Sequence, residues 1–451
     1  MKKAYLHVHI VTVDDQDHVW PDGGILYEGG TITAVGESAS VERLARERGA
    51  EILDGGGKYL FPGLVNTHTH LYQELTKGLG SDLSLEEWFP KAMAPVGAAL
   101  REEHMEAGVA LGLLEAVRSG VTTVADYMQH QPVPGLGCVE LDVAKQMGVR
   151  MVYGRGYRDI GRAEVVEDAG HIFADVEDLK ARYVQPDGMI TVWLAPAASW
   201  GLSDALMRET RRYADATGTP IMMHLFETGA DEAGSRKRFG KPAIEWFEEA
   251  GLLGPDLLAV HSVALGKEEM EKYRQHHVMV SYNPVSNMYL ASGAAPVRAL
   301  KERGLTVALG TDGAGSNNSN NMLEAMKSGA LLQKVVHRDP QAMTAGEMLR
   351  MATIDGARAL GLGDRIGSIE AGKAADFFLY DPMRSPIACP VCGTPEAALV
   401  YSGDHRAIDT VVIQGQTVLE CGILTKGDED AILAQARCMA ADLLRHIRQE
   451  T

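Results

Sequence analysis

The residues best suited to do chemistry are two histidines, His68 and His70, at the end of an apolar run that begins at Phe61. Residues i and i+2 of a β-strand point to the same side, so both imidazoles can be directed at one point. Imidazoles placed in this way could bind a divalent metal ion. A single His-x-His pair is weak evidence, because the chain has 15 histidines and a buried histidine is usually a hydrogen-bonded core residue. The choice between these interpretations depends on finding further ligands.

The elements that would position these histidines follow a repeating pattern. From residue 59 onward, mostly apolar runs alternate with amphipathic stretches that have the 3.6-residue period of a helix. The apolar runs cover residues 59–68, 121–127, 149–156, 190–199, 220–227, 257–264, 278–283 and 306–313. Eight such units over roughly 250 to 300 residues are typical of a (β/α)8 TIM barrel. A doubly wound sheet would need fewer strands and a Gly-rich dinucleotide loop, which the sequence lacks.

Both ends of the chain have β character, with short β-rich runs separated by glycine turns. A helix is predicted over 428–447, where apolar residues recur at spacings of three and four. We therefore predict an α/β fold with three parts. Residues 59–364 form the barrel, and residues 1–58 and 365–451 together form a small β-sandwich domain.

Polar residues stand at the carboxyl ends of several predicted barrel strands. In a TIM barrel these ends surround one mouth, where the active site lies. Besides His68 and His70, the strand ends carry His224, Glu227, His261 and Asp312. If each were a core or capping residue, their shared position would be a series of coincidences. The sequence therefore predicts one joint site.

Composition and charge narrow the class of protein. With 43 basic and 61 acidic residues, the net charge is −18, so nucleic acid and anionic membranes are not expected partners. The odd number of five cysteines argues against a disulfide framework, and we interpret the Cys389–Cys392 pair as incidental. No signal peptide or run of 18 apolar residues is found, so we expect a cytoplasmic protein. A homo-oligomer is a default expectation.

An ordered set of motifs covering essentially the whole chain resembles the amidohydrolase superfamily, specifically its cytosine-deaminase-like branch of aminohydrolases. Within that branch the chain is most similar to melamine deaminases, atrazine chlorohydrolases and guanine- or adenosylhomocysteine-type deaminases. The motifs are Pro-Gly-Leu-Val-Asn-Thr-His-Thr-His at 62–70, His-Leu-Phe-Glu at 224–227, Val-His-Ser at 260–262, Asn-Pro-Val-Ser-Asn at 283–287, Gly-Thr-Asp-Gly at 310–313 and Met-Ala-Thr-Ile-Asp-Gly-Ala-Arg at 351–358.

The resemblance implies that one divalent metal ion is bound by four residues: His68, His70, His224 and Asp312. Members of the superfamily with two metals carry a carboxylated lysine at the end of strand four. Residues 194–199 contain no lysine, so a mononuclear site is expected. Nitrogen and oxygen ligands suit zinc, with iron(II) as an alternative.

The resemblance also implies hydrolytic removal of an amino group. A bound metal lowers the pKa of water to about 7, so hydroxide is available to attack the ring carbon that carries the amino group. Glu227 would protonate the neighbouring ring nitrogen, provided that its strand ends before it. His261 would polarise the water, although a role as fifth ligand stays open. Asp312 would take the proton and pass it to departing ammonia.

The substrate is less well determined. We expect Gln73 to hydrogen-bond the substrate ring and Trp88 to stack on it, with packing in the core as the alternative for Trp88. Arg155 is a further candidate contact. In relatives that deaminate adenosylhomocysteine, a glutamate that binds ribose stands where this chain has Gly97, and a histidine stands where it has Ala197. These differences favour a free heterocycle over a nucleoside.

We therefore expect a metal-dependent deaminase of a free guanine-type aminopurine or an aminotriazine. A triazine dechlorinase or alkylaminohydrolase and a methylthioadenosine or adenosylhomocysteine deaminase stay open as alternatives. A barrel kept only as a binding protein fits least, because all four ligands are present. Tyr282, where many relatives carry histidine, either enters the pocket or packs beneath it.

Overall fold

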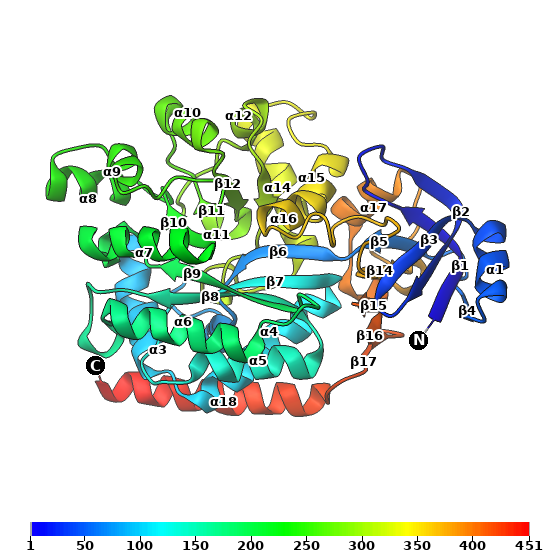
Figure 1. The fold of residues 1–451 in the computed structure, drawn as a ribbon, viewed down its shortest axis with the longest axis horizontal. Coiled ribbons are helices and arrows are strands. Elements are labelled where there is room, and N and C mark those ends of the chain that lie inside the picture. Colours follow the sequence, from blue (N-terminus) through cyan, green and yellow to red (C-terminus); the bar gives the residue numbers. More distant parts are fainter. Residues whose placement is uncertain (1, 451) are drawn as a thin grey trace.

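The computed structural model describes residues 2–450, and Figure 1 shows a barrel beside a smaller β unit. The barrel sheet has eight parallel strands that lie in sequence order. They are β6 (Leu64–Thr69), β7 (Val121–Met128), β8 (Arg150–Tyr157), β9 (Ile190–Pro196), β10 (Ile221–Leu225), β11 (Leu257–His261), β12 (Met279–Tyr282) and β13 (Val307–Leu309). The prediction of a TIM barrel is confirmed.

The barrel closes between its last and first strands through individual hydrogen bonds. Thr67 Oγ1 donates to the carbonyl oxygen of Leu309 at 3.0 Å. The backbone N–H of Asp312 donates to the carbonyl oxygen of His68, with 2.9 Å between nitrogen and oxygen. The closure therefore brings Asp312, from the end of the barrel, next to the His-x-His pair at its beginning.

Apolar side chains from the strands fill the interior of the barrel. Val65, Val152, Trp193, Met222 and Leu258 belong to one buried cluster contributed by five different strands. Side chains of this size close the barrel below the carboxyl ends of the strands, as expected of this fold. The space left for a ligand is therefore at the mouth.

Helices cover the outside of the barrel and connect its strands (Figure 1). They are α4 (Glu102–Arg118), α5 (Leu136–Met147), α6 (Ala169–Tyr183), α7 (Asp204–Thr217), α8 (Ala230–Phe239), α9 (Ala243–Glu249), α10 (Lys267–His276), α11 (Pro284–Tyr289), α12 (Val297–Glu302), α13 (Ala314–Asn317), α14 (Met322–His337), α15 (Ala345–Met351) and α16 (Ile354–Ala359). Helix α7 shows how the sequence sets the ends of these helices. The side chain of Ser203 caps its first turn, and Gly218 ends the helix with a left-handed φ of +67°.

The smaller β unit is a nine-stranded mixed sheet formed from both chain ends, as predicted. Its strands are β1 (Lys2–Val11), β2 (Val19–Glu28), β3 (Thr31–Glu37), β4 (Glu51–Asp54), β5 (Tyr59–Pro62), β14 (Phe377–Tyr380), β15 (Ile408–Ile413), β16 (Gln416–Glu420) and β17 (Ile423–Leu424). Strand β5 joins the two halves, because it pairs with β1 on one side and β14 on the other. Helices α1 (Ser38–Glu47) and α17 (Pro395–Ser402) belong to the same chain segments.

The strand predicted over residues 59–68 is two strands in two different sheets. Strand β5 lies in the smaller sheet and β6 starts the barrel, with Gly63 between them. A Cβ atom on Gly63 would lie 2.0 Å from Oγ1 of Thr122, so only glycine fits this crossing point. The sequence predicted one strand instead of two because the apolar run continues unbroken from the smaller sheet into the barrel.

The insert after β6 forms η1 (Leu71–Thr76), α2 (Leu85–Trp88), η2 (Phe89–Met93) and α3 (Ala94–Ala99). The terminal helix α18 (Glu429–Glu450) lies along the barrel beside α4 (Figure 1), where Nε2 of His104 is 3.0 Å from Oδ2 of Asp442. None of the helices described is long and apolar enough to cross a membrane.

Candidate active site

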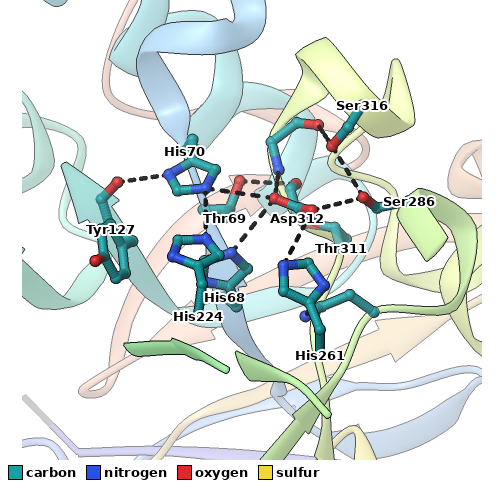
Figure 2. A network of polar contacts seen from close by, with 12 residues as sticks. His68, Thr69, His70, Tyr127, His224, His261, Ser286, Thr311, Asp312 and Ser316 are labelled. Carbon is teal, nitrogen blue, oxygen red and sulfur yellow. Dashed lines mark hydrogen bonds and ion pairs between the residues drawn. The ribbon is translucent and has the colours of Figure 1, made fainter. Parts of the chain in front are cut away.

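Four side chains from three parts of the barrel converge on one point at its mouth (Figure 2). His68 lies on β6, His70 directly follows it, His224 lies on β10, and Asp312 follows β13. Nε2 of His68 and Nε2 of His70 lie 3.3 and 3.5 Å from Oδ1 of Asp312. Nε2 of His224 lies 3.2 Å from Nε2 of His70. The structure thus brings all four predicted ligands together.

The hydrogen bonding of these side chains fits a bound cation. Nε2 of His68, which faces Oδ1 of Asp312, is buried and has no hydrogen-bond partner within residues 2–450. Nδ1 of His70 donates to the carbonyl oxygen of Tyr127 at 2.6 Å, which leaves the lone pair on its Nε2 free. Converging nitrogen lone pairs without donors are costly when buried, and a divalent metal would satisfy them. Three imidazoles and one carboxylate are a donor set that zinc prefers.

Burial sets the protonation states that metal binding needs. It lowers the pKa of His70 to about 4 and the pKa of His224 well below its usual value, and the neighbouring His68 adds to both effects. Burial alone would raise the pKa of Asp312, but its contacts with His68, His261 and His70 hold that pKa well below the usual range. Neutral imidazoles and an ionised carboxylate are the forms that bind a metal ion.

Left-handed backbone conformations turn the chain at three strand ends of the site. The φ angle is +53° at Phe226, +74° at His261 and +64° at Asp312. Such angles are uncommon in residues other than glycine and cluster at functional sites. At Phe226 the turn ends β10, so Glu227 lines the same cavity as His224. The expectation that the strand ends before Glu227 is met.

Glu227 and His261 face each other beside the four ligands. Oε2 of Glu227 lies 3.4 Å from Nε2 of His261, which lies 3.8 Å from Oδ2 of Asp312. Burial, and then the charge of Asp312, raises the pKa of Glu227 to about 8. Burial lowers the pKa of His261 to about 3. At neutral pH the site therefore holds a protonated carboxyl group, a neutral imidazole and an ionised carboxylate.

Two residues of the 283–287 motif orient these groups, and residue spacing alone did not predict this. Oγ of Ser286 donates to Oδ2 of Asp312 at 2.6 Å, as Figure 2 shows. Nδ2 of Asn287 lies 3.0 Å from Nδ1 of His261, so Nε2 of that ring carries its proton toward the cavity. Both residues lie in α11, which directly follows strand β12. This position at a strand end was the signal available in the sequence.

Tyr282 packs beneath the site and does not enter the cavity. Its buried hydroxyl lies 3.2 Å from Nε2 of Gln333 on α14. The alternative left open by the sequence is therefore resolved in favour of packing.

The three predicted substrate contacts have different positions. Gln73 and Trp88 line the cavity, and both are held by Gly315. The backbone N–H of Gly315 donates to Oε1 of Gln73 at 3.2 Å, and Nε1 of Trp88 donates to the carbonyl oxygen of Gly315 at 3.1 Å. Arg155 does not line the cavity. Its guanidinium is paired with Glu167 and Asp175 instead. We therefore do not carry Arg155 forward as a substrate contact.

Two aromatic residues of the cavity were not predicted. Phe89, from η2, and Trp200, from η4 (Ser199–Gly201), line it with ring centroids 4.8 Å apart. The signal for Trp200 was its position just after the fourth barrel strand. Phe89 had no signal beyond its place in the insert after β6.

An eight-stranded barrel with a buried His/Asp cluster at its mouth defines a class of metal-dependent hydrolases. The model of the amidohydrolase family matches residues 59–418, and the chain belongs to this family. The resemblance noted in the motifs is confirmed. So is the prediction of a hydrolase that acts on carbon–nitrogen bonds.

Similar proteins extend over nearly the whole chain. A 5'-deoxyadenosine deaminase from Methanobrevibacter smithii is 35% identical over 92% of this chain and 92% of its own. A 5-methylthioadenosine/S-adenosylhomocysteine deaminase from Bacillus cytotoxicus is 33% identical over 97% of this chain and 98% of its own. The crystal structure of an adenosine deaminase from Xanthomonas campestris with bound zinc has a TM-score of 0.90 at 31% identity, covering 98% of both chains.

A zinc complex of atrazine chlorohydrolase from Arthrobacter aurescens TC1 also has a TM-score of 0.90, at 24% identity over 97% of this chain and 100% of its own. At that identity the likeness concerns the fold. Together the relatives support a deaminase or related hydrolase.

Proposed function

We propose that this protein is a zinc-dependent aminohydrolase that releases ammonia from an amino-substituted nitrogen heterocycle. The observation that carries the proposal is the convergence of four metal-binding side chains at the mouth of the barrel, with Glu227 and His261 facing each other beside them. Glu227 holds a proton, His261 is neutral and Asp312 is ionised. A proton donor and a proton acceptor therefore face one cavity at the same pH, as hydrolytic deamination requires.

His68, His70, His224 and Asp312 would hold the zinc ion, which when bound supplies water activated for attack. Glu227 donates its proton to the ring nitrogen next to the carbon under attack. Asp312 accepts a proton through Oδ2, which Ser286 orients, and passes it to the departing amino group. His261 acts as a hydrogen-bond donor through Nε2 and stabilises the attacking oxygen.

An aminopurine or aminotriazine ring that carries no ribose is the substrate class that the cavity supports best. A Cβ atom on Gly97 would lie 2.3 Å from Cδ2 of His130, so a ribose-binding side chain at position 97 would require the imidazole to move. Gln73 and Trp88 border the space over the metal ligands, where they can hydrogen-bond and stack on a ring. A 5'-substituted adenosine is the second candidate, favoured by the names of the two relatives.

An ammonia-release screen of zinc-loaded protein tests the proposal. The compounds are guanine, isoguanine, 8-oxoguanine, cytosine, melamine, 5'-deoxyadenosine and methylthioadenosine, with Asp312→Asn as the inactive control. We expect release from one or more of them by the wild type only. Chloride or alkylamine release from triazines, assayed in parallel, would identify the dechlorinase alternative. Bound zinc without any release would contradict the proposal.

A further inference from the structure

A second cavity, of about 490 Å³, adjoins the candidate active site. It shares Leu85, Phe89, Trp200 and Ala230 with the cavity over the metal ligands. That first cavity measures about 50 Å³, so most of the available space lies in the second one. A volume of several hundred Å³ is typical of ligand sites. The two cavities together therefore fit a ring that carries a sizeable substituent.

Arg158 lies on the wall of this second cavity and has no carboxylate partner among residues 2–450. Its side chain is buried, with 4% of the residue exposed. Its Nε and Nη2 atoms have no hydrogen-bond partner in the part of the chain described. The guanidinium carbon lies 5.5 Å from the ring centroids of both Phe89 and Trp200. These rings stabilise the charge through their faces, but the N–H groups remain unpaired.

The other two buried arginines show what a buried guanidinium normally requires. Arg150 has its Nη2 atom 3.0 Å from Oδ2 of Asp376. Arg155 is paired with Glu167 and Asp175. Among the residues described, Arg158 is therefore the buried arginine without a counter-ion. Since an unpaired buried charge is strongly unfavourable, its partner is expected to be a ligand.

Two further residues define the polarity of the cavity. His130 is buried on the same wall, and both of its ring nitrogens lack partners in the described chain. Burial lowers its pKa well below the usual value, so it offers one neutral N–H donor. Glu86 stands on the exposed rim and forms no ion pair with Arg158 in the structure as described. The buried wall is thus cationic and rich in donors.

This wall lies close to the metal ligands. The ring centroid of His130 is 6.2 Å from that of Tyr72, which is 6.2 Å from that of His70. A substituent on a ring beside His70 can therefore extend toward the wall that His130 and Arg158 share.

We propose, on the basis of the aminohydrolase function above, that the second cavity binds a carboxylate-bearing substituent of the substrate and that Arg158 is its counter-ion. The planar guanidinium matches the two oxygens of a carboxylate, and His130 supplies a further donor. Arg158 is the buried cation of this cavity and Arg162 stands on its solvent-exposed side, so the buried wall suits a monoanion better than the dianion of a phosphate. The apolar part of the substituent lies along Phe89 and Trp200, which line both cavities.

Matched acids and amides test this site on the zinc-loaded protein. The probes are 9-(4-carboxybutyl)guanine and 9-(4-carboxybutyl)adenine, their carboxamides, and the corresponding phosphonates, with affinity measured by calorimetry and ammonia release followed in the same samples. Each acid is expected to bind at least about tenfold more tightly than its amide, because the amide cannot form the charge-assisted hydrogen bonds of a carboxylate with the guanidinium. Arg158→Gln should abolish the difference, and Arg158→Lys should retain part of it.

Arg162→Gln is the matched control, because Arg162 lines the same cavity with a side chain 42% exposed and should not change the preference. Thermal unfolding of Arg158→Gln should occur at no lower temperature than in the wild type, since the variant removes an unpaired buried charge. Four results would each overturn the inference. They are equal binding of acid and amide by the wild type, an equal loss of both in Arg158→Gln, no binding of any acid, and tighter binding of the phosphonate than of the acid. Acid preference without ammonia release would contradict the proposed function alone, and ammonia release without acid preference would contradict this inference alone.

Discussion

At the scale of single residues, the site depends on two buried carboxyl groups whose pKa values move in opposite directions. Burial, and then the negative charge of Asp312, raises the pKa of Glu227 to about 8. Asp312 is just as buried, but three histidines around it hold its pKa well below the usual range. Two carboxyl groups separated in this way can act as acid and base at one pH.

Replacing Glu227 by glutamine tests the assignment of the acid. The amide has nearly the same shape but has no proton to transfer, so kcat should fall by about 100- to 10,000-fold. Zinc content, measured by elemental analysis, should stay that of the wild type, because Glu227 is not one of the four ligands. A kcat within a factor of about ten of the wild type would rule out this role.

Individual residues also mark how far the sequence could predict the site. His68, His70, His224 and Asp312 were predictable because each stands at a strand end, and strand ends of a barrel meet. Arg155 and Arg158 were not distinguishable, since they stand three residues apart near the end of the same strand. Their difference comes from Glu167 and Asp175, which pair with Arg155. Tertiary partners of this kind leave no pattern in the sequence.

At the level of helices and strands, the sequence predicted the barrel strands but not the positions at which one element ends and the next begins. Eight apolar runs correspond to eight barrel strands, because parallel strands covered by helices must be apolar on both faces. The crossing at Gly63 was hidden, since residues on either side are equally buried in two different sheets. The ends of β10 and β13 were also hidden, because nothing in the sequence marks left-handed turns at Phe226 and Asp312.

Strand β7 and helix α5 are connected by a buried pair of carboxyl groups, Asp126 and Glu140. Burial raises the pKa of Asp126 to about 7, and burial and then the charge of Asp126 raise the pKa of Glu140 well above its usual value. Both oxygens of Glu140 and Oδ2 of Asp126 are buried without a hydrogen-bond partner among residues 2–450, so we expect one of the two groups to keep a proton. A raised pKa in the folded state means that the pair's contribution to stability is complete at acidic pH and is lost as pH rises through the folded pKa.

The variant Glu140→Gln should make this part of the barrel insensitive to pH, because the amide mimics the protonated acid. Its unfolding temperature relative to the wild type should therefore increase as pH rises from about 5 to about 8. Thermal unfolding followed by circular dichroism across that range measures the difference. A difference that does not change with pH would show that the pair is not protonated in the folded protein.

At the scale of the whole molecule, one buried ion pair joins the barrel to the smaller sheet. Arg150 begins β8 and Asp376 directly precedes β14, and both side chains are 1% exposed. Arg150 also donates to the carbonyl oxygen of Gly188 at 2.8 Å and to Oε1 of Gln414 at 2.9 Å. The C-terminal part of the smaller sheet is therefore fixed to the barrel by polar contacts.

Replacing Asp376 by alanine should lower the free energy of unfolding by about 3–5 kcal/mol, since it leaves a buried guanidinium without a partner. The double variant Arg150→Met/Asp376→Leu should recover most of that loss, because neither charge remains. Denaturant unfolding of the three proteins gives the comparison. If Asp376→Ala alone were as stable as the wild type, the pair would not hold the two units together.

The most direct measurement of the central claim is the titration of metal-free protein with zinc while ammonia release is followed, using any substrate found in the screen. The account predicts no release without metal, a rise in proportion to added zinc, and a plateau at one zinc ion per chain, with no rise in His224→Ala. Ammonia release by the metal-free protein, or a plateau at two zinc ions per chain, would contradict a mononuclear metal-dependent aminohydrolase.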